Sequence, residues 1–191
     1  LSPKGEADYK KLKQVDKDTW EVEIPKVTAY AHQAGFAPDG KHFVIMNAIM
    51  QNNVMVYDSS DNSNPSKWKK VATVEKPEWR GTYPQTFHMG FTPDSKKFYV
   101  TLWWPSPTPN GVAVIDAVNW KVIKEIEIGP DQHTIAVTYD GKHVIGVFSG
   151  YQKTTSGIFV LDAKSDELLG FLPNTGGSHD HVIIPRTLQD L

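Results

Sequence analysis

An internal repeat is the feature that most constrains how this chain can fold. A histidine followed by a short apolar run and a tight turn occurs three times, in HQAGFAPDGK (32–41), HMGFTPDSKK (88–97) and HTIAVTYDGK (133–142). Each turn is followed by an apolar run and then by a run ending in aspartate: VMVYD, VAVID and IFVLD. A self-similar unit of about 45 residues indicates a repeat architecture, in which neighbouring units bury a shared core.

Each unit contains four runs with the character of β-strands. The runs are rich in β-branched and aromatic residues, which favour strands over helices, and their Asp-Gly and Asp-Ser pairs suit tight hairpins. Four short strands per unit are typical of a β-propeller blade. We therefore predict an all-β fold, a β-propeller. Its second, third and fourth strands are expected at 42–47, 54–58 and 68–76, at 97–104, 112–116 and 120–129, and at 143–148, 158–162 and 167–173.

The repeat count predicts a ring larger than this chain. WEVEIPKV (20–27) is interpreted as the fourth strand of a preceding blade, and HDHVIIPR (179–186) contains the first strand of a following one. Residues 2–16 are expected to form a helical turn or a loop. Because a propeller needs at least four blades to close, residues 1–191 are expected to be a single domain, the C-terminal part of a propeller. The remaining blades would come from a missing N-terminal segment or a second chain.

The repeated histidines are the first candidates for a functional site. His32, His88, His133 and His179 stand where each unit enters its first strand, at spacings of 56, 45 and 46 residues. The first strand of a propeller blade lines the central channel, so equivalent positions in successive blades lie at similar height and radius. A lone histidine at a strand start is usually structural. Four at one equivalent place predict imidazoles that converge on the channel and bind a transition metal.

The other three histidines do not follow this pattern. His42 and His143 both follow Asp-Gly-Lys, where the middle unit has Lys97, so we interpret them as surface residues near a turn. His181 lies two residues beyond His179 and on a strand would point to the same side. It could support a ligand without binding the ion itself.

Composition narrows the choice of metal. The chain has no cysteine, which excludes a disulfide framework and thiolate ligands. Structural zinc sites favour Cys and His at short spacings, which are absent here. An iron site with two histidines and a carboxylate would need a nearby acid. Asp131 and Asp180 could serve, but no such acid recurs in the repeat. A histidine-rich set without thiolates favours copper.

Charge and hydropathy argue against two classes of partner. The formal net charge is −2, and the sequence has no basic run that would indicate nucleic acid or an anionic membrane. No apolar stretch approaches the roughly 20 residues of a membrane span. We therefore expect neither a nucleic-acid partner nor a membrane span.

Two resemblances follow from these residues. The pattern KKFYVTLWW…GVAVIDAVNWKVIKEIEIG, within residues 96–129, resembles the YVTN-type propeller repeat. With the four histidines added, essentially the whole chain resembles the C-terminal part of the thiocyanate dehydrogenase family. That family contains copper enzymes of sulfur-oxidising bacteria and is distantly similar to the propeller domain of nitrous oxide reductase.

The resemblance implies a seven-bladed propeller with three copper ions on its axis, of which this chain supplies about three and a half blades. The family is periplasmic. It oxidises thiocyanate with water to cyanate and sulfur, and passes two electrons to an acceptor such as a cytochrome c. By this resemblance His32, His88, His133 and His179 are copper ligands, and Phe87 lies beside the substrate. The family's other ligands and its catalytic lysine and glutamate have no counterpart in these residues.

Two alternatives stay open at this stage. The first is a copper propeller that acts on another small substrate, in the manner of nitrous oxide reductase. That resemblance would bring a second copper domain with Cys ligands, and this chain has no Cys. The second is a metal-free YVTN-type propeller that serves as a binding scaffold, which would be expected to lack histidine at the start of its inner strands.

Overall fold

The structure is a computed structural model, and nearly all of the residues it describes are in strands or in the turns between them. The 3-10 turn η2 (Pro65–Lys67) lies between two strands of the first blade. No helix in the described part of the chain is long and apolar enough to cross a membrane. The structure describes residues 12–14, 16–17, 20–22, 30–48, 52–61, 64–76, 79, 85–103, 111–129, 132–148 and 157–173.

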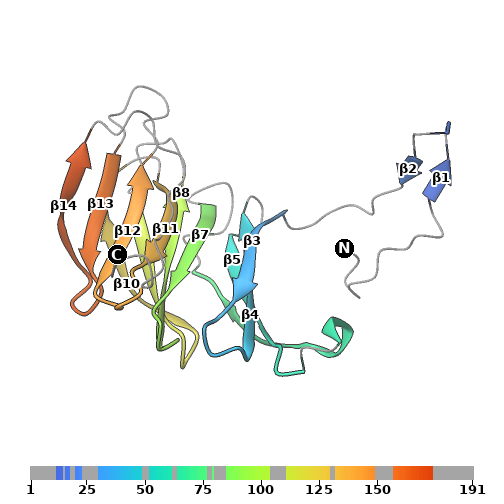
Figure 1. Ribbon diagram of the computed structural model, residues 1–191, viewed down its shortest axis with the longest axis horizontal. Coiled ribbons are helices and arrows are strands. Elements are labelled where there is room, and N and C mark those ends of the chain that lie inside the picture. Colours follow the sequence, from blue (N-terminus) through green and yellow to red (C-terminus); the bar gives the residue numbers. More distant parts are fainter. Residues whose placement is uncertain are drawn as a thin grey trace, which may run out of the picture.

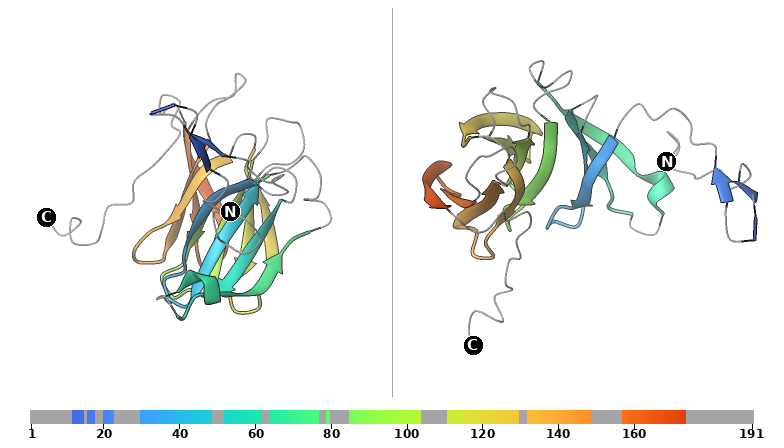
Figure 2. Two further views of the ribbon diagram at one scale, coloured as in Figure 1. Left: turned by 90° about the vertical axis from the view of Figure 1, so that its right-hand side faces the viewer. Right: turned by 90° about the horizontal axis from the view of Figure 1, so that it is seen from above.

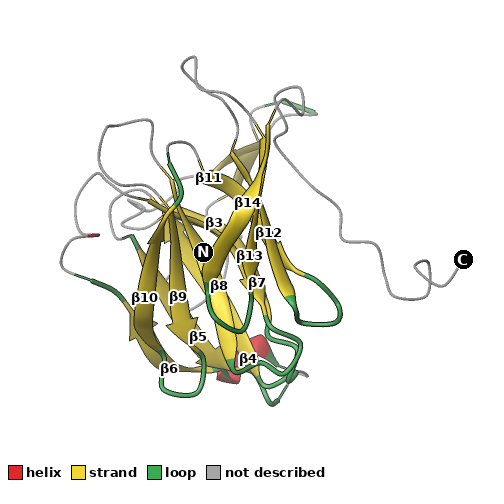
Figure 3. Ribbon diagram, turned by 90° about the vertical axis from the view of Figure 1, so that its left-hand side faces the viewer, coloured by secondary structure: helices red, strands yellow, loops and turns green. Residues whose placement is uncertain are grey.

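Three four-stranded antiparallel sheets make up three blades, and every strand pairs with its neighbours in the sequence (Figures 1 and 3). The first blade consists of β3 (Tyr30–Phe36), β4 (His42–Ala48), β5 (Asn53–Asp58) and β6 (Lys69–Val74). The second consists of β7 (Gln85–Phe91), β8 (Lys97–Trp103), β9 (Gly111–Asp116) and β10 (Lys121–Glu127). The third consists of β11 (Gln132–Val137), β12 (His143–Phe148), β13 (Gly157–Asp162) and β14 (Glu167–Pro173). The predicted four-strand unit is thus confirmed in all three copies.

A separate two-stranded sheet precedes the blades. It pairs β1 (Leu12–Gln14) with β2 (Trp20–Val22) in antiparallel register. The strand predicted at 20–27 is therefore present at its start, and residues 23–27 lie outside the described residues. The expectation of a helical turn or loop over 2–16 was wrong for residues 12–14, which form a strand because β2 supplies hydrogen-bonding partners that a local pattern does not reveal.

The hairpin that joins the first two strands of each blade is held by an aspartate. Asp39 Oδ1 accepts the N–H of Lys41 at 2.7 Å, and Asp94 and Asp140 make the same contact two residues ahead. The residue after each aspartate has a positive φ: 67° at Gly40, 57° at Ser95 and 70° at Gly141. Glycine adopts this conformation without steric cost, which explains the Asp-Gly turns.

The strand-ending aspartates organise the turn from the third to the fourth strand. Asp116 Oδ1 accepts the N–H of Val118 at 2.8 Å, and Asp162 Oδ1 accepts that of Lys164 at 2.8 Å. Hydrogen bonds favour the charged carboxylate and lower the pKa of both aspartates below its ordinary value. The largest contribution comes from the Asn119 side chain at Asp116 and from the Ser165 N–H at Asp162. The repeated aspartate is therefore a turn residue.

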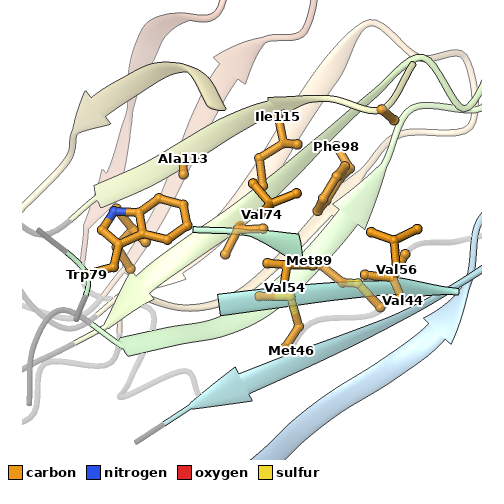
Figure 4. Close-up of a cluster of buried hydrophobic side chains, with 13 residues drawn as sticks. Val44, Met46, Val54, Val56, Val74, Trp79, Met89, Phe98, Ala113 and Ile115 are labelled. Atoms are coloured by element: carbon orange, nitrogen blue, oxygen red, sulfur yellow. The ribbon is translucent and has the colours of Figure 1, made fainter. Parts of the chain in front are cut away.

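The first two blades pack face to face around an apolar core (Figure 4). Valine and methionine side chains of the first blade meet aromatic and aliphatic side chains of the second, and all are withdrawn from solvent. Burial of this apolar surface is the main force that holds the blades together. The core includes Val44, Met46, Val54, Val56 and Val74 on one side, and Phe98, Val100, Leu102, Ala113 and Ile115 on the other.

A second core joins the second blade to the third. Tyr99, Val112 and Val114 of the second blade pack against Val144, Phe159 and Leu161 of the third. Viewed from above, the three sheets lie side by side (Figure 2, right). The first strands are adjacent, since β3 contacts β7 and β7 contacts β11. This adjacency brings the candidate site together.

Candidate metal centre

Three of the four predicted histidines lie beside one another. His32 is in β3, His88 in β7 and His133 in β11, the first strands of three successive blades. The imidazole centroids of His32 and His88 are 5.0 Å apart with a 61° angle between the rings. Those of His88 and His133 are also 5.0 Å apart, at 42°. The repeat-equivalent histidines thus form a continuous row across the blades.

Each of these histidines lies at an interruption in its strand pairing. The register between first and second strand shifts between Ala31 and Gln33, between Thr86 and Met89, and between Gln132 and Ile135. A bulge of this kind leaves a residue outside the regular ladder and turns its side chain in a new direction. All three blades therefore have a bulge as well as a histidine at this position.

The row is shielded from solvent. His133 is 7% exposed and counts among the buried polar residues, while His32 and His88 are partly buried. The Nε2 atom of His88 and the Nδ1 atom of His133 are both inaccessible to water. The three imidazoles thus lie in surroundings that are partly closed to bulk water.

Two polar side chains link the strands that carry the rings. Gln33 Oε1, next to His32, accepts the N–H of Met89 at 2.6 Å and so ties β3 to β7. Thr101 Oγ1 in β8 accepts the N–H of His88 at 2.9 Å and donates to the carbonyl oxygen of His133 at 2.8 Å. Each neighbouring pair of histidine strands is thereby joined by one polar side chain.

Several predicted residues lie outside the described residues. These are His179, the fourth ligand candidate, together with His181, Asp131 and Asp180. Phe87 is described only through its backbone, which lies in β7 directly before His88.

His42 and His143 lie apart from the row, as predicted. They open β4 and β12, at the end of each hairpin opposite to the row. His42 is not simply a surface residue, however. Its Nδ1 lies 2.7 Å from Asp39 Oδ2, and its ring centroid lies 5.0 Å from that of Trp120 in the next blade. It is a contact between blades, which a sequence pattern within one blade does not reveal.

Within the part of the chain that the structure describes, no group of three or more His, Cys, Asp or Glu is arranged so that it could hold a metal ion. The three rings instead form two successive pairs. Each pair offers imidazole nitrogens, the donors that copper, zinc and iron share.

Sequence reasoning missed the residues that hold the row in place. Thr101 is fully buried and is the fifth residue of its strand, where the other two blades have the apolar residues Met46 and Val147. A hydroxyl at a position that is otherwise apolar could have signalled a hydrogen-bonding role. Gln33, beside a predicted ligand, carried no comparable signal.

Comparisons with known proteins bear on the fold. No protein-family model matches the sequence, and no curated protein matches it. Many solved structures are similar, and hydrazine synthase, a WD40 protein and a lactonase are among them. Hydrazine synthase of Kuenenia stuttgartiensis has 17% identity and a TM-score of 0.57, over 76% of this chain and 43% of that one. The WD40 repeats of RRP9 have 8% identity and a TM-score of 0.60, over 81% and 41%.

The third similar structure is a putative 6-phosphogluconolactonase from Bacteroides fragilis, with 17% identity and a TM-score of 0.57, over 80% of this chain and 40% of that one. The chain thus spans less than half the length of each of these structures. At such identities the likeness concerns the fold alone. Blade architecture and comparisons together define the class: this chain is part of a β-propeller. This chain carries a row of three histidines on the first strands of its blades.

Proposed function

We propose that the protein is a copper-dependent oxidoreductase of the periplasm that oxidises thiocyanate. The observation that carries the proposal is the contact of His32, His88 and His133, from equivalent positions in three successive blades, at ring spacings of 5.0 Å. The balanced reaction converts thiocyanate and water to cyanate and elemental sulfur, with release of two protons and two electrons. An acceptor such as a cytochrome c takes the electrons.

The donor set fits copper. Imidazole suits copper among the first-row metals, and two rings bound to one ion through bonds of about 2.0 Å have centroids about 4.5–5 Å apart. When bound, copper would accept electrons and lower the pKa of a coordinated water. His32, His88 and His133 would supply ring nitrogens in two successive pairs, with His179 as a further ligand and Phe87 beside the substrate.

This chain's own residues prepare the site. The bulges direct the imidazoles out of the strand ladder, and the apolar cores between blades keep the three strands at fixed separation. Partial burial of the row excludes bulk water, which strengthens electrostatic attraction between an anionic substrate and cations at the site. The set of three ions proposed for the site requires further ligands from outside this chain.

Further blades are part of the proposal. Ile158 and Val160 of β13 are only half-buried, whereas Val112 and Val114 at the equivalent places in β9 are fully buried by the third blade. An apolar face of this kind favours cover by a following blade of the same type. A seven-bladed ring would provide it.

The test is metal analysis and turnover on one preparation of the protein. We expect copper by mass spectrometry, oxidation of thiocyanate with an electron acceptor, and loss of both in a His32→Gln, His88→Gln, His133→Gln triple variant. Copper without thiocyanate oxidation would favour another small substrate. A protein that stays metal-free in copper-containing medium would instead favour a binding scaffold.

A further inference from the structure

We propose that Thr101 is a positioning residue that fixes His88 and His133 relative to each other. For copper binding, the inference rests on the proposed function. Its geometric part stands without a metal, because it concerns the backbone positions of two residues in metal-free protein. Thr101 lies in β8 of the second blade and is fully buried.

The bulge in β7 lies opposite Thr101. Thr86 pairs with Leu102 and Met89 pairs with Val100, so Phe87 and His88 together stand opposite the single residue Thr101. A bulge leaves a backbone group without its partner in the strand ladder. The Thr101 hydroxyl takes the place of that missing partner for His88, because it accepts the His88 N–H at 2.9 Å.

The same hydroxyl also reaches the next blade. Its proton goes to the carbonyl oxygen of His133 at 2.8 Å, and the carbonyl oxygen of His88 is a more distant acceptor at 3.4 Å. His133 lies at the bulge of β11. One oxygen atom therefore bonds to the backbones of two histidines whose rings are 5.0 Å apart.

The equivalent positions in the other two blades indicate that a hydroxyl is not needed to fill this space. The equivalent residues Met46 and Val147 are fully buried and apolar. Valine has nearly the shape of threonine, so Thr101→Val removes the two hydrogen bonds while the side chain still fills its space. Buried backbone groups left without a partner move or distort to find one, and the imidazoles attached to them would move as well.

The test compares three variants by two measurements on metal-free protein. One is the position of the His88 and His133 imidazole resonances in NMR spectra, and the other is the affinity for added Cu²⁺. Thr101→Val should shift both resonances and weaken Cu²⁺ binding about tenfold, as is typical when a residue that orients a ligand is lost. Thr101→Ser keeps the hydroxyl and should stay within about threefold of wild type.

Thr92→Val is the matched control. The Thr92 hydroxyl lies 2.8 Å from both Asp94 Oδ1 and the carbonyl oxygen of Lys97, and it accepts the N–H of Lys97 at 3.1 Å, at the opposite end of the same hairpin. The Thr92→Val variant should leave the imidazole resonances and the Cu²⁺ affinity unchanged. Thr101→Ala repeats the test with a smaller side chain if Thr101→Val does not fold.

The outcomes separate this inference from the proposed function. If wild-type protein binds no Cu²⁺, the proposed function fails, and the resonances alone decide the role of Thr101. Unchanged resonances in Thr101→Val or Thr101→Ala overturn the inference. Equal shifts in Thr101→Ser or in Thr92→Val overturn it too, because the hydroxyl would then not be the specific cause.

Discussion

Lys97 and Asp166 form a largely buried ion pair that joins the second blade to the third, with Lys97 Nζ 2.8 Å from Asp166 Oδ1. The carboxylate also accepts the hydroxyl proton of Tyr99 at 2.7 Å. Burial and this carboxylate raise the pKa of Tyr99 far above its ordinary value. Between the first and second blades, the equivalent contact is the ring contact of His42 with Trp120. The first residue of the second strand therefore joins successive blades in both cases, by a ring contact at His42 and by an ion pair at Lys97.

The first prediction concerns Asp166→Asn. Asparagine tolerates the positive φ of 57° at this position and can still bond to Tyr99, so the change chiefly removes the negative charge beside the buried Lys97 ammonium. We expect the free energy of unfolding to fall by about 2 kcal/mol, as measured by urea denaturation. Lys97→Met in the same protein should restore part of the loss. An unchanged denaturation midpoint in Asp166→Asn would show that the pair does not stabilise the blade interface.

The second prediction concerns acid. The pKa values of Asp116 and Asp162 are lowered in the folded protein by hydrogen bonds within their turns. A lowered pKa contributes stability above the unfolded value of 3.8, and that contribution is lost as pH falls through the folded pKa. We therefore expect the melting temperature to decrease as the pH is lowered below about 4. Melts from pH 3 to 6 should show a smaller drop for Asp116→Asn, and an equal drop would refute this role.

The third prediction concerns a close approach near the histidine row. A Cβ atom added at Gly90 in β7 would lie 2.9 Å from the Cα of Ala136 in β11. Gly90→Ala must push the two first strands apart, which we expect to reduce stability by about 1–3 kcal/mol. At Gly170 in β14 an added Cβ meets nothing within 4 Å, so Gly170→Ala is the control. Equal thermal melts of the two variants would contradict the close packing of these strands.

The fourth prediction concerns His133→Gln. Glutamine is similar in size and polarity, but its amide oxygen is a weaker copper donor than imidazole. We expect loss of one copper ion per protein and of nearly all thiocyanate oxidation, with little change in melting temperature, because one polar change leaves the apolar cores intact. His143→Gln, in the same blade, should keep full copper and activity. A collapsed melt in His133→Gln would point to a structural role.

The blades could be predicted from the sequence because their signals are local. Alternating apolar runs and Asp-Gly turns specify strands and hairpins within a few residues. Convergence of His32, His88 and His133 could also be predicted, since equivalent positions in a repeat occupy equivalent places in space. That prediction needed no knowledge of the side chains around them.

The remaining features depend on pairs of segments distant in the sequence. The bulges at the histidines result from the pairing of two strands, and neither strand carries a signal for them alone. The bond from Thr101 to His133 and the contact of His42 with Trp120 both cross a blade boundary. The strand over 12–14 exists because β2 pairs with it. Local sequence patterns do not predict any of these features.

A copper site at the histidine row is tested most directly by anomalous scattering from crystals of copper-loaded protein, recorded on both sides of the copper absorption edge. We expect peaks that vanish below the edge, with a ring nitrogen of each of His32, His88 and His133 about 2.0 Å from a peak. No peak is expected at His42 or His143. A map without copper peaks beside the three histidines would show that the row is not a copper site.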